Sequence, residues 1–148
     1  MKLSTKGTYG LRAVLDIAIH QRSGPVALNS IAKREDISEG YLEQLMALLK
    51  RAGIVRSVRG AQGGYLLTRN PKDLTVGEII RVLEGPVAPV ACVAGDNPEE
   101  CHRAASCVTR LVWEKLAECI SGVLDSFRLE DLVQEAAKRG EQENMYYI

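Results

Sequence analysis

The sequence predicts a mostly α-helical protein with a small β-hairpin wing, that is, a winged helix-turn-helix domain followed by a long dimerisation helix. Two observations lead to this fold class. A helix with a polar face begins at Ser38 and runs directly into a glycine-rich hairpin that ends at Leu67. Farther along, residues 105–127 carry apolar side chains every three or four positions, and few apolar residues remain elsewhere to cover them.

Composition limits the chain to one ordinary domain. It has 148 residues, of which 46% are hydrophobic, and no apolar run approaches the ~20 residues that cross a membrane. The net charge of zero hides an asymmetry. Residues 1–70 hold 11 Lys and Arg against 5 Asp and Glu, whereas residues 71–148 hold the remaining 8 against 14. A basic front half suits nucleic acid. The first six residues lack a secretory signal, so we expect a cytoplasmic protein.

The first two helices form a scaffold. Ser4 or Thr5 can cap the first helix, and Arg22–Pro25 end it. We expect its apolar surface to be largely buried, namely Tyr9, Leu11, Val14, Leu15, Ile17, Ala18 and Ile19. A short second helix covers residues 28–35. Only Glu35–Ile37 separate this region from the next helix, a spacing typical of the turn in a helix-turn-helix.

The third helix carries most of the candidate DNA contacts. Ser38 is its N-cap, Ile37 can pack on Leu42 as a hydrophobic staple, and Gly53 ends it. Its apolar stripe consists of Leu42, Leu45, Met46 and Leu49. The candidate contacts lie at its start and on the opposite face, namely Ser38, Gly40, Tyr41, Glu43 and Gln44. Ser and Gln can hydrogen-bond base edges, so we expect the first turns to enter the major groove.

The hairpin predicts a wing, with strands at 54–58 and 65–67. Arg59 stands at its tip and can enter the adjacent minor groove. Gly60 and Gly63 would let the backbone come close to phosphates. The alternative is that the tip glycines only make a tight turn.

A fourth helix and a loop follow the hairpin. Thr75 and Glu78 form a capping box, and the helix runs to about Leu83 before Gly85-Pro86 stop it. Residues 85–105 then read as a loop of Pro, Gly, Asp, Asn and Glu. Loops of this length inside a compact domain are usually functional or disordered.

Three cysteines, Cys92, Cys101 and Cys107, indicate that this loop is functional. Clustered thiolates in a cytosolic protein favour a soft metal centre over disulfides, and either an iron-sulfur cluster or zinc fits. The fourth ligand stays open between a residue from elsewhere in the chain, a residue of another subunit and nearby residues, namely His102, Asp96, Glu99, Glu100 and Arg110. Cys119 lies on the apolar stripe of the following helix, so we expect it to be a small core residue.

The C-terminal part predicts dimerisation. The stripe of the long helix at 105–127 is about three heptads long, and pairing of residues 107–127 with a second copy would cover it. Packing on the chain's own first and fourth helices is the alternative. A last short helix spans Leu129–Ala136. The predicted units are 1–84 for DNA binding, 85–106 for the cysteine loop, 107–139 for dimerisation and 140–148 for a flexible tail.

These residues resemble the family of winged-helix repressors that includes the iron-sulfur cluster regulator IscR, the nitric-oxide sensor NsrR and the cysteine-metabolism repressor CymR. The resemblance covers about residues 1–139. It is most specific in Met1–Gly7 with Tyr9, Ile37–Ser38 with Tyr41–Leu45, and Ser57–Gly60 with Gly63–Leu67.

The resemblance implies a homodimeric repressor that binds a palindromic operator in double-stranded DNA and holds an iron-sulfur cluster, 2Fe-2S in the IscR branch. By this resemblance, the three cluster ligands are Cys92, Cys101 and Cys107, and the DNA-facing positions are Ser38, Tyr41, Glu43, Gln44, Arg59 and Gly60. Glu43 is the position associated with discrimination between two operator classes. Arg110 stands where IscR has a histidine ligand, and Gly40 replaces a serine.

The predicted function is therefore a transcriptional repressor that senses iron-sulfur cluster status and controls cluster assembly genes, and not an enzyme. One alternative keeps the family but replaces the signal with nitric oxide, thiol redox, zinc or a protein co-repressor. The other is a cysteine-dependent enzyme or metal carrier whose winged domain binds protein.

Overall fold

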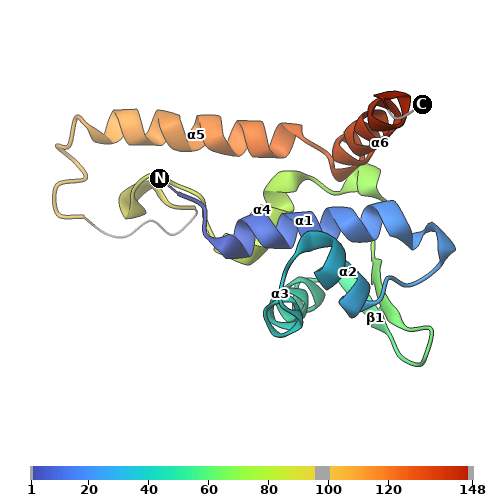
Figure 1. The fold of residues 1–148 in the computed structure, drawn as a ribbon. Coiled ribbons are helices and arrows are strands. Elements are labelled where there is room, and N and C mark those ends of the chain that lie inside the picture. The colour runs from blue at the N-terminus through green and yellow to red at the C-terminus, as the bar shows by residue number, and fades with distance from the viewer. Residues whose placement is uncertain (1, 96–100, 147–148) are drawn as a thin grey trace.

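A computed structural model describes residues 2–95 and 101–146 of the chain (Figure 1). Met1 of the resemblance motif, the candidate ligands Asp96, Glu99 and Glu100, and the last two residues of the predicted tail, Tyr147 and Ile148, lie outside the described residues. No described helix is long and apolar enough to cross a membrane.

Within the described residues the chain forms six α-helices and one hairpin. Their order is α1 (Thr5–His20), α2 (Leu28–Glu35), α3 (Glu39–Arg51), β1 (Val55–Val58), β2 (Gly64–Leu67), α4 (Val76–Glu84), α5 (Arg110–Ser126) and α6 (Leu129–Tyr146). Single turns of 3-10 helix lie at Gln21–Ser23, Pro71–Asp73 and Ala91–Val93. The mostly helical fold class with a hairpin wing is confirmed.

The predicted caps confirm where three helices begin. The Ser4 hydroxyl accepts the Lys6 N–H at 3.2 Å, and the Ser38 hydroxyl accepts the Tyr41 N–H at 3.3 Å. Before α4, the Thr75 hydroxyl accepts the Glu78 N–H at 3.1 Å while the Glu78 carboxylate accepts the Thr75 N–H at 3.0 Å. These bonds satisfy N–H groups that have no partner within the helix.

The core lies among α1, α2, α3, α4 and the hairpin. Its fully buried side chains include Val14 and Ile17 of α1 and the apolar stripe of α3, as the periodicity predicts. The two strands are antiparallel, with Val55 opposite Leu67 and Val58 opposite Gly64. The base of the wing is therefore part of the core.

The long helix and the loop before it differ in detail from the sequence prediction. The helix α5 begins at Arg110 rather than near residue 105, because residues 101–109 form turns. The loop at 85–105 was expected to lack regular structure, yet it contains the 3-10 turn Ala91–Val93. Figure 1 shows α5 running past α4 and extending beyond the rest of the molecule, with the loop at its far end.

The prediction of a short last helix and a flexible tail from residue 140 was wrong, because α6 continues to Tyr146. A single helical glycine such as Gly140 costs only about 1 kcal/mol relative to alanine, and Glu141–Glu143 after it are helix formers. The start of α6 also belongs to the core. Leu129 is fully buried, and its N–H donates to the Leu74 carbonyl at 2.8 Å.

Candidate DNA-binding surface and cysteine loop

The first turns of α3 present a polar face to solvent. Leu42 and Leu45 are 0% and 1% exposed, so the helix cannot rotate without losing its core contacts. This orientation leaves Gly40, Glu43 and Gln44 exposed and Tyr41 half-buried. A Cβ atom on Gly40 would meet no other atom within 4 Å, so this position opens directly into solvent.

Charged pairs hold the helix-turn-helix on α1. Asp16 is 2% exposed, and its carboxylate accepts two hydrogen bonds from Arg34 of α2, both 2.8 Å long. Arg12 of α1 bonds the Glu35 carboxylate at 3.0 Å and the Glu35 carbonyl at 2.5 Å. Asp36 then takes a left-handed conformation, with φ 53°, that ends α2 and leads into the turn.

The wing tip carries exposed Arg59 and Gly60. Gly60 has φ 108°, which favours glycine. A Cβ atom on Gly63 would collide with the Val58 carbonyl, so the turn itself requires glycine there. The tight-turn alternative therefore explains Gly63, and its role as a DNA contact stays a prediction.

The base of the wing is anchored to the scaffold. Val26 and Tyr65 exchange backbone hydrogen bonds of 2.9 and 2.8 Å. The Gln21 side chain, at the end of α1, accepts the Leu67 N–H at 3.0 Å. Figure 1 shows α3 and the hairpin on the side of the molecule opposite α5. The first turns of α3 and the wing tip together form a candidate surface for DNA recognition, called the recognition surface below.

The cysteine loop, residues 85–106, and the turn after it hold three thiols in different surroundings. Cys92 is half-buried in the 3-10 turn, Cys101 is exposed, and Cys107 is half-buried just before α5. All the cysteines are free thiols. The prediction that Cys119 is a small core residue was wrong, because Cys119 is exposed on α5 in the part of the chain that the structure describes.

Cys107 is poised to ionise. The Thr109 hydroxyl lies 3.2 Å from its sulfur, and the Arg110 N–H near the thiol donates to the Cys107 carbonyl at 3.3 Å. These donors, the Thr109 hydroxyl first, lower the pKa of Cys107 from its ordinary value of 9.0. A thiolate at the start of a helix is both a metal ligand and a nucleophile.

The loop thiols match a soft metal centre in chemistry but are not gathered into one. Three uncrosslinked thiols are the donor set that such a centre takes. In residues 2–95 and 101–146, however, no three His, Cys, Asp or Glu side chains stand close enough together to hold a metal ion. His102 is exposed next to Cys101. Arg110 has its Nε 3.0 Å from Glu114, so it serves as an ion-pair partner rather than a ligand.

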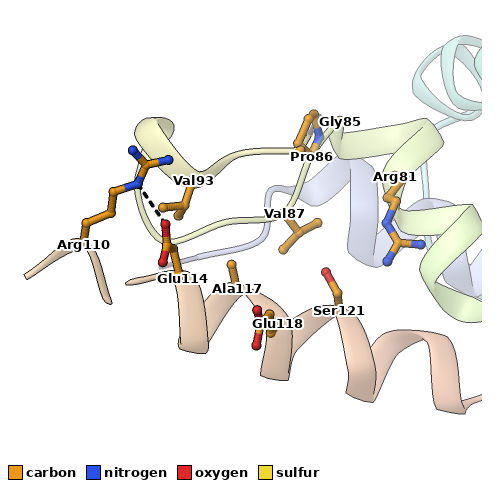
Figure 2. A pocket seen from close by; sticks show the side chains of 11 residues that line it. Arg81, Gly85, Pro86, Val87, Val93, Arg110, Glu114, Ala117, Glu118 and Ser121 are labelled. Atoms are coloured by element: carbon orange, nitrogen blue, oxygen red, sulfur yellow. Dashed lines mark ion pairs between the residues drawn. The ribbon is translucent and has the colours of Figure 1, made fainter. Parts of the chain in front are cut away.

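A cavity of about 650 Å³ separates the first part of the loop from α5 (Figure 2). Val87 and Val93 face it from the loop, and Glu118 and Ser121 face it from α5. At one end Arg81 of α4 makes two hydrogen bonds to Asp125, 2.7 and 2.8 Å long. This pair shows that α5 packs on α4, which is one part of the alternative that it packs on the first and fourth helices.

Among residues 2–95 and 101–146, little covers the remaining surface of α5. No side chain of α5 is fully buried. Its exposed apolar residues, with those that flank it, are Val108, Leu111, Val112, Trp113, Leu116, Val123 and Phe127. Leu111 and Val123 are each 58% exposed. A contiguous apolar stripe of this kind marks an interaction surface.

Comparison with known proteins adds independent evidence. A family model described as "Rrf2: Iron-dependent Transcriptional regulator" matches residues 3–135. The chain is 44% identical to the HTH-type transcriptional regulator CymR of Bacillus subtilis over the full length of both, and the solved structure of that global cysteine regulator superposes with a TM-score of 0.74.

Regulators named IscR are similar as well. The chain is 41% identical to IscR of Serratia proteamaculans, over 90% of this chain and 79% of that protein. The structure of T. potens IscR is 49% identical, with a TM-score of 0.74, over 92% of this chain and 88% of that one. These relatives are transcriptional regulators and not enzymes.

Proposed function

The chain belongs to the Rrf2 family of transcriptional regulators, and from this membership we propose that it is a homodimeric, sequence-specific DNA-binding repressor controlled through its cysteine loop. The observation that carries the proposal is the recognition surface, a polar helix face fixed beside an exposed wing. In this proposal Ser38, Gly40, Tyr41, Glu43 and Gln44 face the major groove. Arg59 enters the minor groove, and Gly60 brings the wing backbone close to phosphate. We place this activity in the cytoplasm.

The exposed stripe of α5 supports the homodimer. Two copies joined there present two recognition surfaces related by a two-fold axis, and such a pair binds a palindromic operator.

Substitution of Arg59 tests the DNA-binding part. We expect Arg59→Ala to weaken operator binding by about 1–3 kcal/mol and to reduce the slope of affinity against salt by about one contact. Fluorescence anisotropy with a labelled operator over a range of salt concentrations measures both quantities. Arg139→Ala, an exposed residue of α6, is the matched control. An unchanged affinity and slope for Arg59→Ala would place the wing outside the interface.

The proposed signal is the status of an iron-sulfur cluster, 2Fe-2S in type, and the proposed targets are genes for cluster assembly. Cys92, Cys101 and Cys107 would hold the cluster. Because Arg110 is paired with Glu114, the fourth ligand would come from His102 or from another subunit. When bound, a cluster supplies metal–sulfur bonds that tie distant points of the loop together. The relatives named IscR and the iron-dependent family description support this proposal.

A second candidate signal is the redox state of a thiol. It is favoured by Cys107, whose pKa is lowered by the Thr109 hydroxyl and the Arg110 N–H. A relative whose structure is described as that of a global cysteine regulator supports it as well.

Single cysteine substitutions separate the two signals. If a cluster is the signal, Cys92→Ala, Cys101→Ala and Cys107→Ala should each remove the visible absorption of anaerobically purified protein and its regulated change in operator affinity. If a thiol is the signal, the protein is colourless and only Cys107→Ala abolishes the response to oxidant. Cys119→Ala, outside the loop, is the control for both. A triple loop variant that regulates like the wild type contradicts both signals.

A further inference from the structure

The helix α1 touches both parts of the recognition surface. At its start, the Thr5 hydroxyl lies 2.8 Å from the Tyr41 hydroxyl of α3. One turn later, the Tyr9 ring packs edge-on against the Tyr41 ring, with centroids 6.2 Å apart and planes at 82°. At its end, Gln21 accepts the Leu67 N–H of the wing. The position of α1 therefore fixes α3 and the wing relative to each other.

The start of α1 is held by the residue that precedes the cysteine loop. Glu84 is the last residue of α4, and Gly85 begins the loop with φ 79°. The Glu84 Oε1 atom accepts the Gly7 N–H at 2.8 Å and the Ser4 hydroxyl at 2.5 Å. One carboxylate thus caps the first turn of α1 from outside that helix.

The helices α1 and α4 pack closely against each other. A Cβ atom on Gly7 would stand 2.7 Å from Glu84 Oε1, and one on Gly10 would collide with the Leu83 side chain. Two glycines one turn apart therefore let the helices approach closely. A rotation at the end of α4 moves the Glu84 backbone relative to α1, and the hydrogen bonds from Ser4 and Gly7 oppose a compensating rotation of the Glu84 side chain.

We propose that Glu84 is a positioning residue that passes the state of the cysteine loop to the recognition surface through the first turn of α1. This inference rests on the proposed regulation through the loop. Rearrangement of the loop turns the Glu84–Gly85 peptide and changes the cap on Ser4 and Gly7. The contacts of Thr5 and Tyr9 with Tyr41 then carry the change to α3. Direct contacts link Glu84 to Tyr41, so a change at the cap has a contiguous route to α3.

Hydrogen exchange tests these contacts without DNA or any loop ligand. In Glu84→Ala we expect exchange to rise about tenfold or more at the Gly7 amide and at amides in the first turn of α3, including Tyr41. Glu84→Gln keeps an acceptor oxygen and should retain most of the protection. Glu78→Ala removes the cap of α4 instead, so it controls for the loss of a helix cap. Unchanged exchange at Tyr41 in Glu84→Ala would overturn the inference whether or not the loop regulates.

Operator affinity tests the coupling. The probe is the ratio of dissociation constants between chelator-stripped, reduced protein and protein reconstituted anaerobically with iron and sulfide. If the wild-type ratio lies in the usual range of about 5–150-fold, Glu84→Ala and Thr5→Val should bring it towards one. Glu84→Gln and Glu78→Ala should keep it. A wild-type ratio of one contradicts iron-sulfur regulation through the loop, whereas a large ratio that survives Glu84→Ala overturns only the role of Glu84.

Discussion

At the scale of single residues, Asp16 shows how strongly one side chain constrains the helix-turn-helix. It is the charged side chain buried most deeply among the described residues, at 2% exposure, and Arg34 compensates it with two hydrogen bonds. Burial of a carboxylate is costly unless it is paired and hydrogen-bonded. The pair therefore fixes the angle of α2 on α1 rather than simply adding stability.

Removal of Arg34 should be costly for this reason. We expect Arg34→Ala to lower the free energy of unfolding by about 2–3 kcal/mol, because the Asp16 carboxylate loses a charged partner. Urea unfolding followed by circular dichroism measures the loss. Lys33→Ala, the exposed neighbour on α2, should change stability by less than about 0.5 kcal/mol. Equal stability of the two variants would show that water replaces the guanidinium without cost.

Sequence patterns predicted which face of α3 is exposed better than they predicted the residues that hold this helix in place. The apolar stripe of α3 defines its exposed face, since residues opposite the stripe must face solvent. Nothing local marks Asp16, Arg34 or Glu84 in the same way. Their partners lie 18 or more residues away in the chain, and such pairings follow from tertiary packing rather than from periodicity.

At the scale of elements, two helix caps depend on ionised carboxylates. The Thr75 N–H, followed by Arg69, lowers the pKa of Glu78 below its ordinary 4.5. The Ser4 hydroxyl, followed by the Gly7 N–H, lowers the pKa of Glu84 in the same direction. Because the folded-state pKa values lie below those of the unfolded chain, this stabilisation is complete above pH 4.5 and is lost as pH falls below it.

The variant Glu78→Gln isolates one of these caps. Its free energy of unfolding should be lower than that of the wild type near neutral pH, because the amide lacks the charge that strengthens the bond to Thr75. The two proteins should converge as pH falls below 4.5 and through the folded-state pKa of Glu78, where the wild-type carboxylate becomes protonated. Urea midpoints over this pH range measure the difference. A difference that stays constant with pH would mean that ionisation of Glu78 is irrelevant to the cap.

Elements with strong end signals were predicted well, and elements without them were not. Ser4, Ser38 and Thr75 are polar caps before apolar periodic segments, and each marks a helix start correctly. The start of α5 has no side-chain cap, so its apolar pattern alone placed it too early. The end of α6 was placed too early because the apolar pattern stops at Ala136 and the residues beyond Arg139 are polar, although several of them favour a helix.

At the scale of the whole molecule, the scaffold of α1 and α4 separates two surfaces with different tasks. Figure 1 shows α3 and the wing on one side and α5 on the other. The basic half of the sequence builds the recognition surface, whereas the acidic half builds the loop, α5 and α6. This separation keeps the negative charges of the acidic half away from the DNA phosphates.

A charged side chain in the exposed stripe of α5 should prevent the proposed dimerisation. We expect Leu116→Lys to convert the proposed dimer into monomers and to weaken operator binding by tenfold or more, because only one half-site is then bound. Light scattering after size exclusion gives the mass, and anisotropy gives the affinity. Lys115→Ala, the neighbouring residue, should leave both unchanged. A Leu116→Lys variant of unaltered mass would locate the subunit contact elsewhere.

The cysteine site shows where prediction from a single sequence ends. The spacing of Cys92, Cys101 and Cys107 indicated the donor chemistry, yet the described protomer does not gather a metal-binding group. The free energy of metal binding itself helps to assemble such sites. In the proposed function, the final arrangement of the loop depends on a ligand and on a second subunit, and local sequence patterns encode neither of them.

The absence of any fully buried side chain in α5 also bears on how the regulator responds to its own abundance. If its apolar contacts form only between two chains, the population able to span an operator grows with the square of chain number when chains are scarce. When growth dilutes the protein, repression would then fall more steeply than the chain concentration does. Mass action alone would therefore make repression depend steeply on how much of the regulator the cell makes, without any change at the cysteines.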